Sequence, residues 1–218
     1  LTESQKNEWQ KVKGRFEEVV FVEPVEQLLF LTAKQLDNGN KRIPEASKEE
    51  FHQLYDLGIS SKVANESLRY NTIRSLYPLD AISSVCLTLA IQRYGQNERS
   101  LFSFLTASGA DSLKSFITSD NTTYNLARVY DYLKYHYYSA LTESNSDSTG
   151  WRAISVALER IENSEYSPEI IAECSDVIKT IGLLNIFFNG IKLDKHFIDI
   201  YGSYALGIKN PSEIISLL

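Results

Sequence analysis

The stretch YPLDAISSVCLTLAIQRYGQNERSLFSFL, from Tyr77 to Leu105, decides the fold of this chain. Its first half is apolar on nearly every side, and a helix without a wide polar face is normally buried at the centre of its domain. Pro78 suits the first turn of that helix, and Gly95 suits the left-handed residue that often follows a helix. The sequence therefore predicts a central buried helix within an all-α, multi-helix bundle.

A second helix is expected directly after the first. Asn97 can cap it, and Glu98 favours the positive end of its dipole. Apolar residues then recur at core spacing, at Leu101, Phe104 and Leu105. Arg99 is the exception, because a cation in the first turn is disfavoured by roughly 0.3–1 kcal/mol. We expect this charge either to pair with an acid such as Glu98, the commoner arrangement, or to point at an anion outside the helix.

The composition is that of a globular protein with a sizeable core. The chain has 218 residues, 43% of them hydrophobic, and 22 Lys and Arg against 28 Asp and Glu give a net charge of −6. This balance argues against a surface devoted to nucleic acid or to an anionic membrane. No apolar run reaches the roughly 18–20 residues of a membrane span, so a cytoplasmic protein with no membrane partner is expected. Cys86 and Cys174 lie in apolar helical runs and are expected to be small buried hydrophobes.

Both ends of the sequence favour a piece of a longer protein. The chain contains no Met. Near the other end, Asn210-Pro211-Ser212-Glu213 opens a helix with a capping residue, a proline at the first position and an acid in the first turn. Only five residues follow it, so this helix is expected to be cut short.

Helical periodicity recurs through the rest of the chain. It predicts helices over residues 3–20, 25–36, 47–58, 61–75, 113–117, 124–141, 151–161, 168–188 and 194–206. A polar connection is expected over residues 37–44, and Asn189-Gly190 is expected to end the helix that Ser167-Pro168 opens. No run alternates with period two for long, so no strand is expected.

The low-complexity segment TESNSDSTG, residues 142–150, is expected to be a flexible linker. It would separate a lid-like helical domain, residues 1–141, from a helical segment, residues 151–218. That segment leads from Asp194 into a truncated helix-turn-helix, the outline that opens many winged-helix domains.

The aromatic helix over residues 124–141 has one expected core face, formed by Leu126, Tyr130, Leu133 and Tyr137. Other tyrosines, Tyr132, Tyr135 and Tyr138, fall on different faces. A tyrosine stripe can stack on bases, but such sites usually interleave Arg or Lys, and here only Arg128 and Lys134 are present. Packing against neighbouring helices is therefore the better interpretation.

The sequence contains no complete active site of a recognisable class. The three histidines, His52, His136 and His196, lie on unrelated helices and at no metal-ligand spacing. There is no G-x-x-x-x-G-K-[ST], no G-x-G-x-x-G and no G-x-S-x-G.

The stretch from Tyr77 to Leu105 resembles the YPLHP…QNERSLFSFL block of large bacterial P-loop ATPases, the BREX-type phage-defence ATPases and related AAA-like or STAND-like proteins. In that family the block lies in the helical region after the ATPase core. Three further stretches fit in the same order: Trp9…Arg15-Phe16…Glu23-Pro24…Gln27-Leu28-Leu29, Val129-Tyr130-Asp131-Tyr132-Leu133 and Lys179-Thr180-Ile181-Gly182-Leu183-Leu184-Asn185. Together they span nearly the whole chain.

The resemblance implies a helical lid that closes over a nucleotide held by the ATPase core of the same parent chain. The lid would act as a relay that couples the nucleotide state to the engagement of another protein of the system or of DNA. Pro78 and Arg99 match the residues that would approach the nucleotide, and a γ-phosphate would be the anion that Arg99 needs. The motif around them comprises Tyr77, Gln96, Asn97 and Glu98. ATP and Mg are expected for the parent protein and neither for this chain alone, because the Walker lysine and its magnesium-binding partners are not in it. Asp80 stands where the family usually has His.

Two other functions compete with this interpretation. The first is a non-enzymatic interaction scaffold that docks another protein on the Tyr-rich face around Tyr130 to Tyr138, and exposed aromatic surface would favour it. The second is a DNA-binding module that uses the terminal helix-turn-helix. Lys192, Lys195 and Lys209 would be its only basic residues there, against the acidity of the whole chain.

Overall fold

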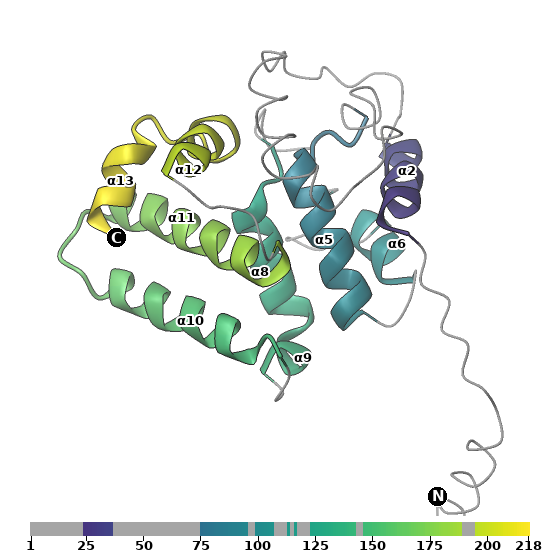
Figure 1. The fold of residues 1–218 in the computed structure, drawn as a ribbon, viewed down its shortest axis with the longest axis horizontal. Coiled ribbons are helices and arrows are strands. Elements are labelled where there is room, and N and C mark those ends of the chain that lie inside the picture. Colours follow the sequence, from purple (N-terminus) through teal and green to yellow (C-terminus); the bar gives the residue numbers. More distant parts are fainter. Residues whose placement is uncertain are drawn as a thin grey trace, which may run out of the picture.

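The computed structural model describes residues 24–36, 75–95, 99–106, 113, 116, 123–142, 146–188 and 195–218. All regular secondary structure in these ranges is helical (Figure 1), which confirms the predicted all-α bundle. The α-helices are α2 (Val25–Leu36), α5 (Ala81–Tyr94), α6 (Arg99–Thr106), α8 (Leu126–His136), α9 (Tyr138–Thr142), α10 (Ser148–Glu162), α11 (Pro168–Phe187), α12 (Lys195–Tyr201) and α13 (Pro211–Leu217). The helices expected over 3–20 and 47–58 lie outside the described residues, as does the helix expected over 61–75 except for Ser75. The connection over 37–44 and Asn189-Gly190 lie outside them too.

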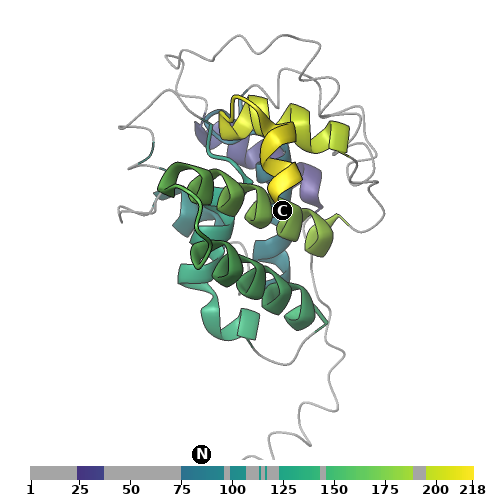
Figure 2. The same cartoon turned by 90° about the vertical axis from the view of Figure 1, so that its left-hand side faces the viewer.

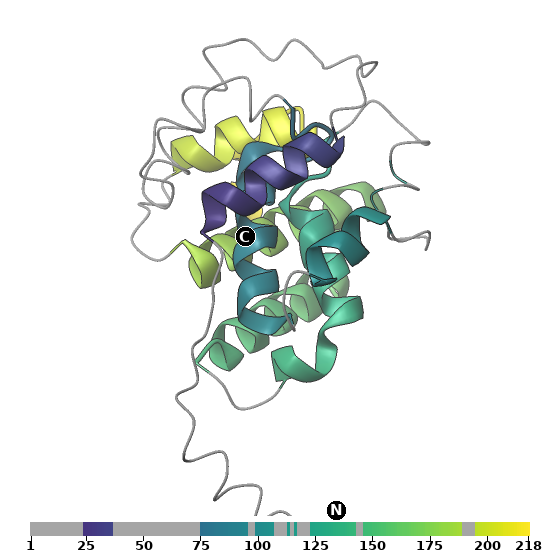
Figure 3. The ribbon, with the colours of Figure 1, turned by 90° about the vertical axis from the view of Figure 1, so that its right-hand side faces the viewer.

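Helix α5 is buried, as its sequence predicts. Nine of its 14 residues have almost no exposed surface, and they include polar Ser83, Ser84 and Thr88. The hydroxyls of Ser84 and Thr88 donate to the carbonyls four residues earlier, each at 2.8 Å, so their burial leaves no unpaired donor. Helices α2, α6, α8 and α11 surround α5; α2 crosses it in Figure 3.

The start of α5 differs from the prediction. Pro78 lies before the helix rather than in its first turn, after a cis Tyr77–Pro78 peptide bond. Its carbonyl accepts a hydrogen bond of 2.7 Å from the N–H of Tyr124, and this link between segments keeps Pro78 outside the helix. Asp80 is the capping residue instead. At the other end, Gly95 is extended, with φ −83°, rather than left-handed.

Helix α11 is the second centre of the fold. It packs against α5, α8, α10 and α13, and Figures 1 and 2 show α10 and α11 side by side. Two glycines allow this close approach, because a β-carbon on Gly182 would collide with Ile154 and one on Gly150 would lie 2.9 Å from Ile186 Cγ1. Helix α10 begins at Ser148, inside the expected linker, and the buried apolar side chains on both sides of that linker form one cluster.

The aromatic segment is two helices rather than one, since α8 ends at His136 and α9 begins at Tyr138. Leu126, Tyr130 and Leu133 are buried as predicted. Tyr132 is buried as well, with its ring centroid 4.8 Å from that of Phe104 on α6. Two other tyrosines stay on the surface, Tyr135 at 73% and Tyr138 at 56% exposure.

The C-terminal helices form a pair. Helix α12 runs into a π-helical turn, Gly202–Leu206, which ends at Gly207 in the left-handed conformation with φ 70°. Helix α13 starts with Pro211 at its first position, as predicted, but the Asn210 side chain makes no capping hydrogen bond. Lys195 and Lys209 are exposed, and Lys192 lies outside the described residues.

Candidate functional site

The predicted nucleotide-contacting residues lie beyond opposite ends of α5. Tyr77 is half-buried and Pro78 is buried before its first turn, whereas Arg99 opens α6 after its last. A helix of 14 residues is about 21 Å long. The side chain of Arg99 is not described, and Gln96, Asn97 and Glu98 lie outside the described residues. The structure therefore describes a packed Pro78 and does not bring it beside Arg99.

Asp80 is the centre of a buried polar cluster that also contains Ser83 and Tyr201, the Asp80 cluster. Its Oδ1 accepts the backbone N–H groups of Ile82 and Ser83, both at 2.9 Å. Its Oδ2 accepts the hydroxyl of Ser83 at 2.6 Å and that of Tyr201 at 2.8 Å. Four donors thus surround one carboxylate that has almost no contact with solvent.

The Tyr201 hydroxyl also accepts the backbone N–H of Leu126, the first residue of α8, at 3.0 Å. One phenol therefore joins the start of α5, the start of α8 and the end of α12. A neighbouring bond strengthens this junction, since the Asn125 side-chain amide donates to the carbonyl of Ala205 at 3.0 Å. The segment that carries the sequence motif is in this way tied to the C-terminal helices.

Burial dominates the electrostatics of the Asp80 cluster. It raises the pKa of Asp80, and the hydrogen bonds from Ser83, Tyr201 and Ile82 offset only part of that rise. Burial also raises the pKa of Tyr201, and the nearby Asp80 charge raises it further. The phenol therefore stays protonated and donates a hydrogen bond to the carboxylate. An Asp80 held in this way is better suited to a structural junction than to the role of a general base.

A second polar cluster joins the end of α5 to the start of α10. Asp147 Oδ2 accepts Tyr94 Oη at 2.6 Å and Arg93 Nη1 at 2.8 Å, and the Trp151 indole N–H donates to Tyr94 Oη at 3.0 Å. Burial raises the pKa of Asp147, but the bonds from Tyr94 and Arg93 and the guanidinium charge lower it by more. Burial and the bond to Asp147 together raise the pKa of Tyr94 to about 12.

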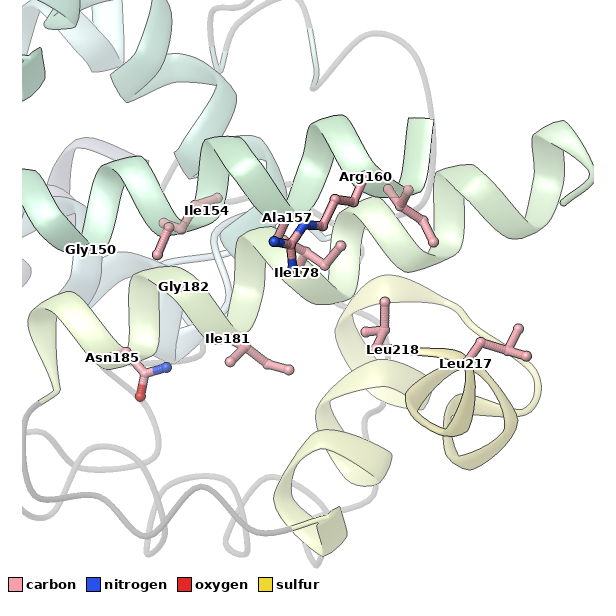
Figure 4. A pocket seen from close by; sticks show the side chains of 12 residues that line it. Gly150, Ile154, Ala157, Arg160, Ile178, Ile181, Gly182, Asn185, Leu217 and Leu218 are labelled. Atoms are coloured by element: carbon pink, nitrogen blue, oxygen red, sulfur yellow. The ribbon is translucent and has the colours of Figure 1, made fainter. Parts of the chain in front are cut away.

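An apolar groove of about 460 Å³ runs between α10 and α11 (Figure 4), and we call it the α10–α11 groove. It is lined by Gly150, Ala153, Ile154, Ala157, Arg160 and Ile161 of α10, by Ile178, Ile181, Gly182 and Asn185 of α11, and by Leu217 and Leu218. The residues from each helix recur at three- and four-residue steps, so each helix presents one stripe to the groove. A volume of this size lies within the range of about 300–1,000 Å³ that is usual for ligand sites.

A more polar pocket of about 530 Å³ lies on the other side of α10. Lys134 and Arg152 line it together with Tyr138 and several hydroxyl side chains. The Lys134 ammonium lies 5.0 Å from the centroid of the Tyr138 ring and 3.5 Å from Ser155 Oγ. The cation–π contact partly satisfies the charge of Lys134 without an acid.

Only some residues of these sites could be predicted from the sequence. The signal that could have identified Asp80 is local, because Asp is a preferred capping residue and stands directly before the apolar run. Tyr201 lies 121 residues further on, and no local pattern links the two. A helix over residues 168–188 was predicted, whereas the role of α11 as one wall of a groove depends on where α10 packs.

Among the residues that the structure describes, no group of His, Cys, Asp and Glu could hold a metal ion. None of the described helices is long and apolar enough to span a membrane. Cys86 and Cys174 are free and buried, as predicted. Comparison of the chain with protein-family models, with curated proteins and with solved structures finds no match.

Proposed function

We propose that this chain is a helical lid and relay segment of a larger P-loop ATPase, which couples the nucleotide state to the engagement of a partner or of nucleic acid. The observation that carries the proposal is the Asp80 cluster. It links the motif segment at Tyr77–Asp80 to α12, and α12 packs on α13, which packs on α11. Coupling between distant sites travels through packed elements of this kind when they have two arrangements.

The proposed relay depends on the two contacts of the Tyr201 hydroxyl, with the Asp80 carboxylate and with the N–H of Leu126. A shift of the Tyr77–Asp80 segment toward a nucleotide would stretch the 2.8 Å bond from Tyr201 to Asp80. Because the same hydroxyl accepts the N–H of Leu126 at 3.0 Å, the strain would reach α8 and α12 together. Helix α13 packs on α11, which lines the α10–α11 groove, so the relay would end at a surface suited to a partner.

The first experiment measures ATP hydrolysis with Mg by the parent protein. We expect Arg99→Ala to reduce turnover at least roughly tenfold, which corresponds to about 1.4 kcal/mol of transition-state stabilisation. Arg152→Ala is the matched control, because Arg152 is an exposed arginine away from the motif. The 218-residue chain alone should hydrolyse no ATP. Equal turnover by the parent and its Arg99→Ala variant would refute the lid assignment.

The second experiment tests the relay itself. Hydrogen exchange across α12 and α13 is measured in the parent protein with and without ATP. We expect ATP to change the exchange in wild type, and the change to disappear in Tyr201→Phe. The same exchange with and without ATP in wild type would contradict the relay.

A second candidate function is a non-enzymatic docking scaffold, and the exposure of Tyr135 and Tyr138 favours it. Exposed aromatic rings are frequent anchors of protein interfaces. The measurement is partner capture by the parent protein with Tyr135→Ser and Tyr138→Ser. If these variants lose partner binding without any change in ATP hydrolysis, the scaffold function would be favoured over the relay.

A further inference from the structure

We propose that the α10–α11 groove binds one amphipathic α-helix of a partner protein, and that a carboxylate on this helix pairs with Arg160. The inference rests on the partner-binding half of the proposed function and names the chemistry of that partner. It requires no nucleotide.

The shape of the groove favours a helix. Its two walls are helices that lie side by side, and a third helix can pack its side-chain ridges into the groove between them. Small residues, Ala153 and Ala157, form part of the α10 wall and allow a close approach. On the α11 wall, Ile178 and Ile181 are only partly buried, because the core covers one side of each and the groove leaves the other open.

The chain itself extends the apolar surface of the groove. Leu217 is 37% exposed and Leu218 is 51% exposed, and both line the groove at the end of α13. Figure 4 shows them across from the α10 stripe. Burying the open sides of Ile178 and Ile181 under a partner would supply apolar contact that drives helix docking.

Arg160 defines the charge of the occupant. It is exposed on α10 and lines the groove, and in Figure 4 its guanidinium extends from α10 toward α11. Within the part of the chain that the structure describes, its guanidinium makes no hydrogen bond or ion pair, in contrast to the side chains of Arg93 and Lys179, which both pair with aspartates. An arginine beside apolar walls is matched by a carboxylate, which it can hold with two parallel hydrogen bonds.

The test uses fluorescently labelled synthetic peptides with the 218-residue chain. Each peptide is about 15 residues long, the length of α10, and carries leucines at helical spacing on one face. One version has a single glutamate one turn after the last leucine, and another has it one turn before the first. We expect a micromolar Kd from fluorescence anisotropy for one of the two versions.

Matched variants identify the groove. Arg160→Glu should weaken binding of the glutamate peptide about fivefold to tenfold, and a lysine in place of the glutamate should restore it. Arg152→Glu should change nothing, because Arg152 is exposed on α10 but lies outside the groove. Ala153→Trp should fill the groove and abolish binding, whereas Val156→Trp, at an exposed position of α10 outside the groove, should not. Circular dichroism confirms that each variant is folded.

Three results would overturn the inference. The first is the absence of binding by both peptides. The second is binding that neither Arg160→Glu nor Ala153→Trp alters. The third is sedimentation of the wild-type chain as a dimer that Ala153→Trp dissociates, since the occupant would then be a second copy. Because the peptide assay contains no nucleotide, its failure is distinct from failure of the ATPase experiment on the parent protein.

Discussion

The Tyr201→Phe substitution tests the central junction of the fold by removing one oxygen atom. The Tyr201 ring is buried and stacks on Phe197, with centroids 6.2 Å apart and an interplanar angle of 6°, and a phenylalanine keeps that packing. The substitution loses the 2.8 Å bond to the Asp80 carboxylate and leaves the N–H of Leu126 without its acceptor. The volume of the core barely changes, so any loss of stability comes from hydrogen bonds.

The magnitude follows from these two losses. A hydrogen bond to a charged group contributes about 1.5–3 kcal/mol, and a buried donor without a partner costs about 1–3 kcal/mol. Because the Ser83 hydroxyl and the N–H groups of Ile82 and Ser83 still donate to Asp80, we expect a combined loss of about 3 kcal/mol in the free energy of unfolding. For a chain of this size, such a loss lowers the Tm by about 6–12 °C.

Urea unfolding followed by circular dichroism measures the loss, and an unchanged m-value shows that the folded state is intact. Tyr135→Phe is the control, because Tyr135 is 73% exposed and its variant should stay within about 0.5 kcal/mol of wild type. If Tyr201→Phe were destabilised by less than about 1 kcal/mol, the hydroxyl would not hold the junction, and the relay argument would lose its basis.

Three further substitutions test other parts of the fold by urea unfolding. Asp147→Asn should lower the free energy of unfolding by about 1 kcal/mol at pH 7. Because the folded-state pKa of Asp147 is lowered, its contribution to stability is present above the unfolded pKa and disappears as the pH falls through the folded pKa. Variant and wild type should therefore converge in stability in acid, and a constant difference would contradict the assignment. Gly182→Ala should lower the free energy of unfolding by about 1–3 kcal/mol, because the new β-carbon collides with Ile154. Gly150→Ala should lower it by less, because its β-carbon would make a milder contact with Ile186, and equal losses would refute this reasoning. Gly207→Ala should lose about 1 kcal/mol although nothing surrounds it, since its φ of 70° is unfavourable for alanine, and unchanged stability would exclude that strain.

The central helix could be predicted from the sequence because the signal is local. The segment from Ile82 to Ile91 contains no charged residue and no wide polar face, so the sequence predicts burial of α5 in any fold. The start of α5 was predicted wrongly because it depends on a contact that is distant in the sequence. Pro78 and Asp80 both suit a helix start, and the choice between them depends on Tyr124, which bonds to the carbonyl of Pro78.

Burial of Tyr132 illustrates the same limit. Periodicity along α8 assigned it to a face away from the core, but α6 brings Phe104 against that face. The Asp80 cluster and the α10–α11 groove likewise combine residues from different helices. The sequence revealed one wall or one partner of each, and only the tertiary packing supplies the other.

The position of α11 has a consequence for how the chain is made. Helices α5 and α8 leave the ribosome before the helix that covers them, because α11 ends at Phe187, about 50 residues after the end of α8. At usual rates of synthesis this interval lasts about 3–10 s, during which the side of α8 that packs on α11 is not yet covered. The nascent protein is therefore open to misassembly or chaperone binding until α11 emerges, and the hydroxyl-rich segment at 142–150 is among the residues synthesised in that interval.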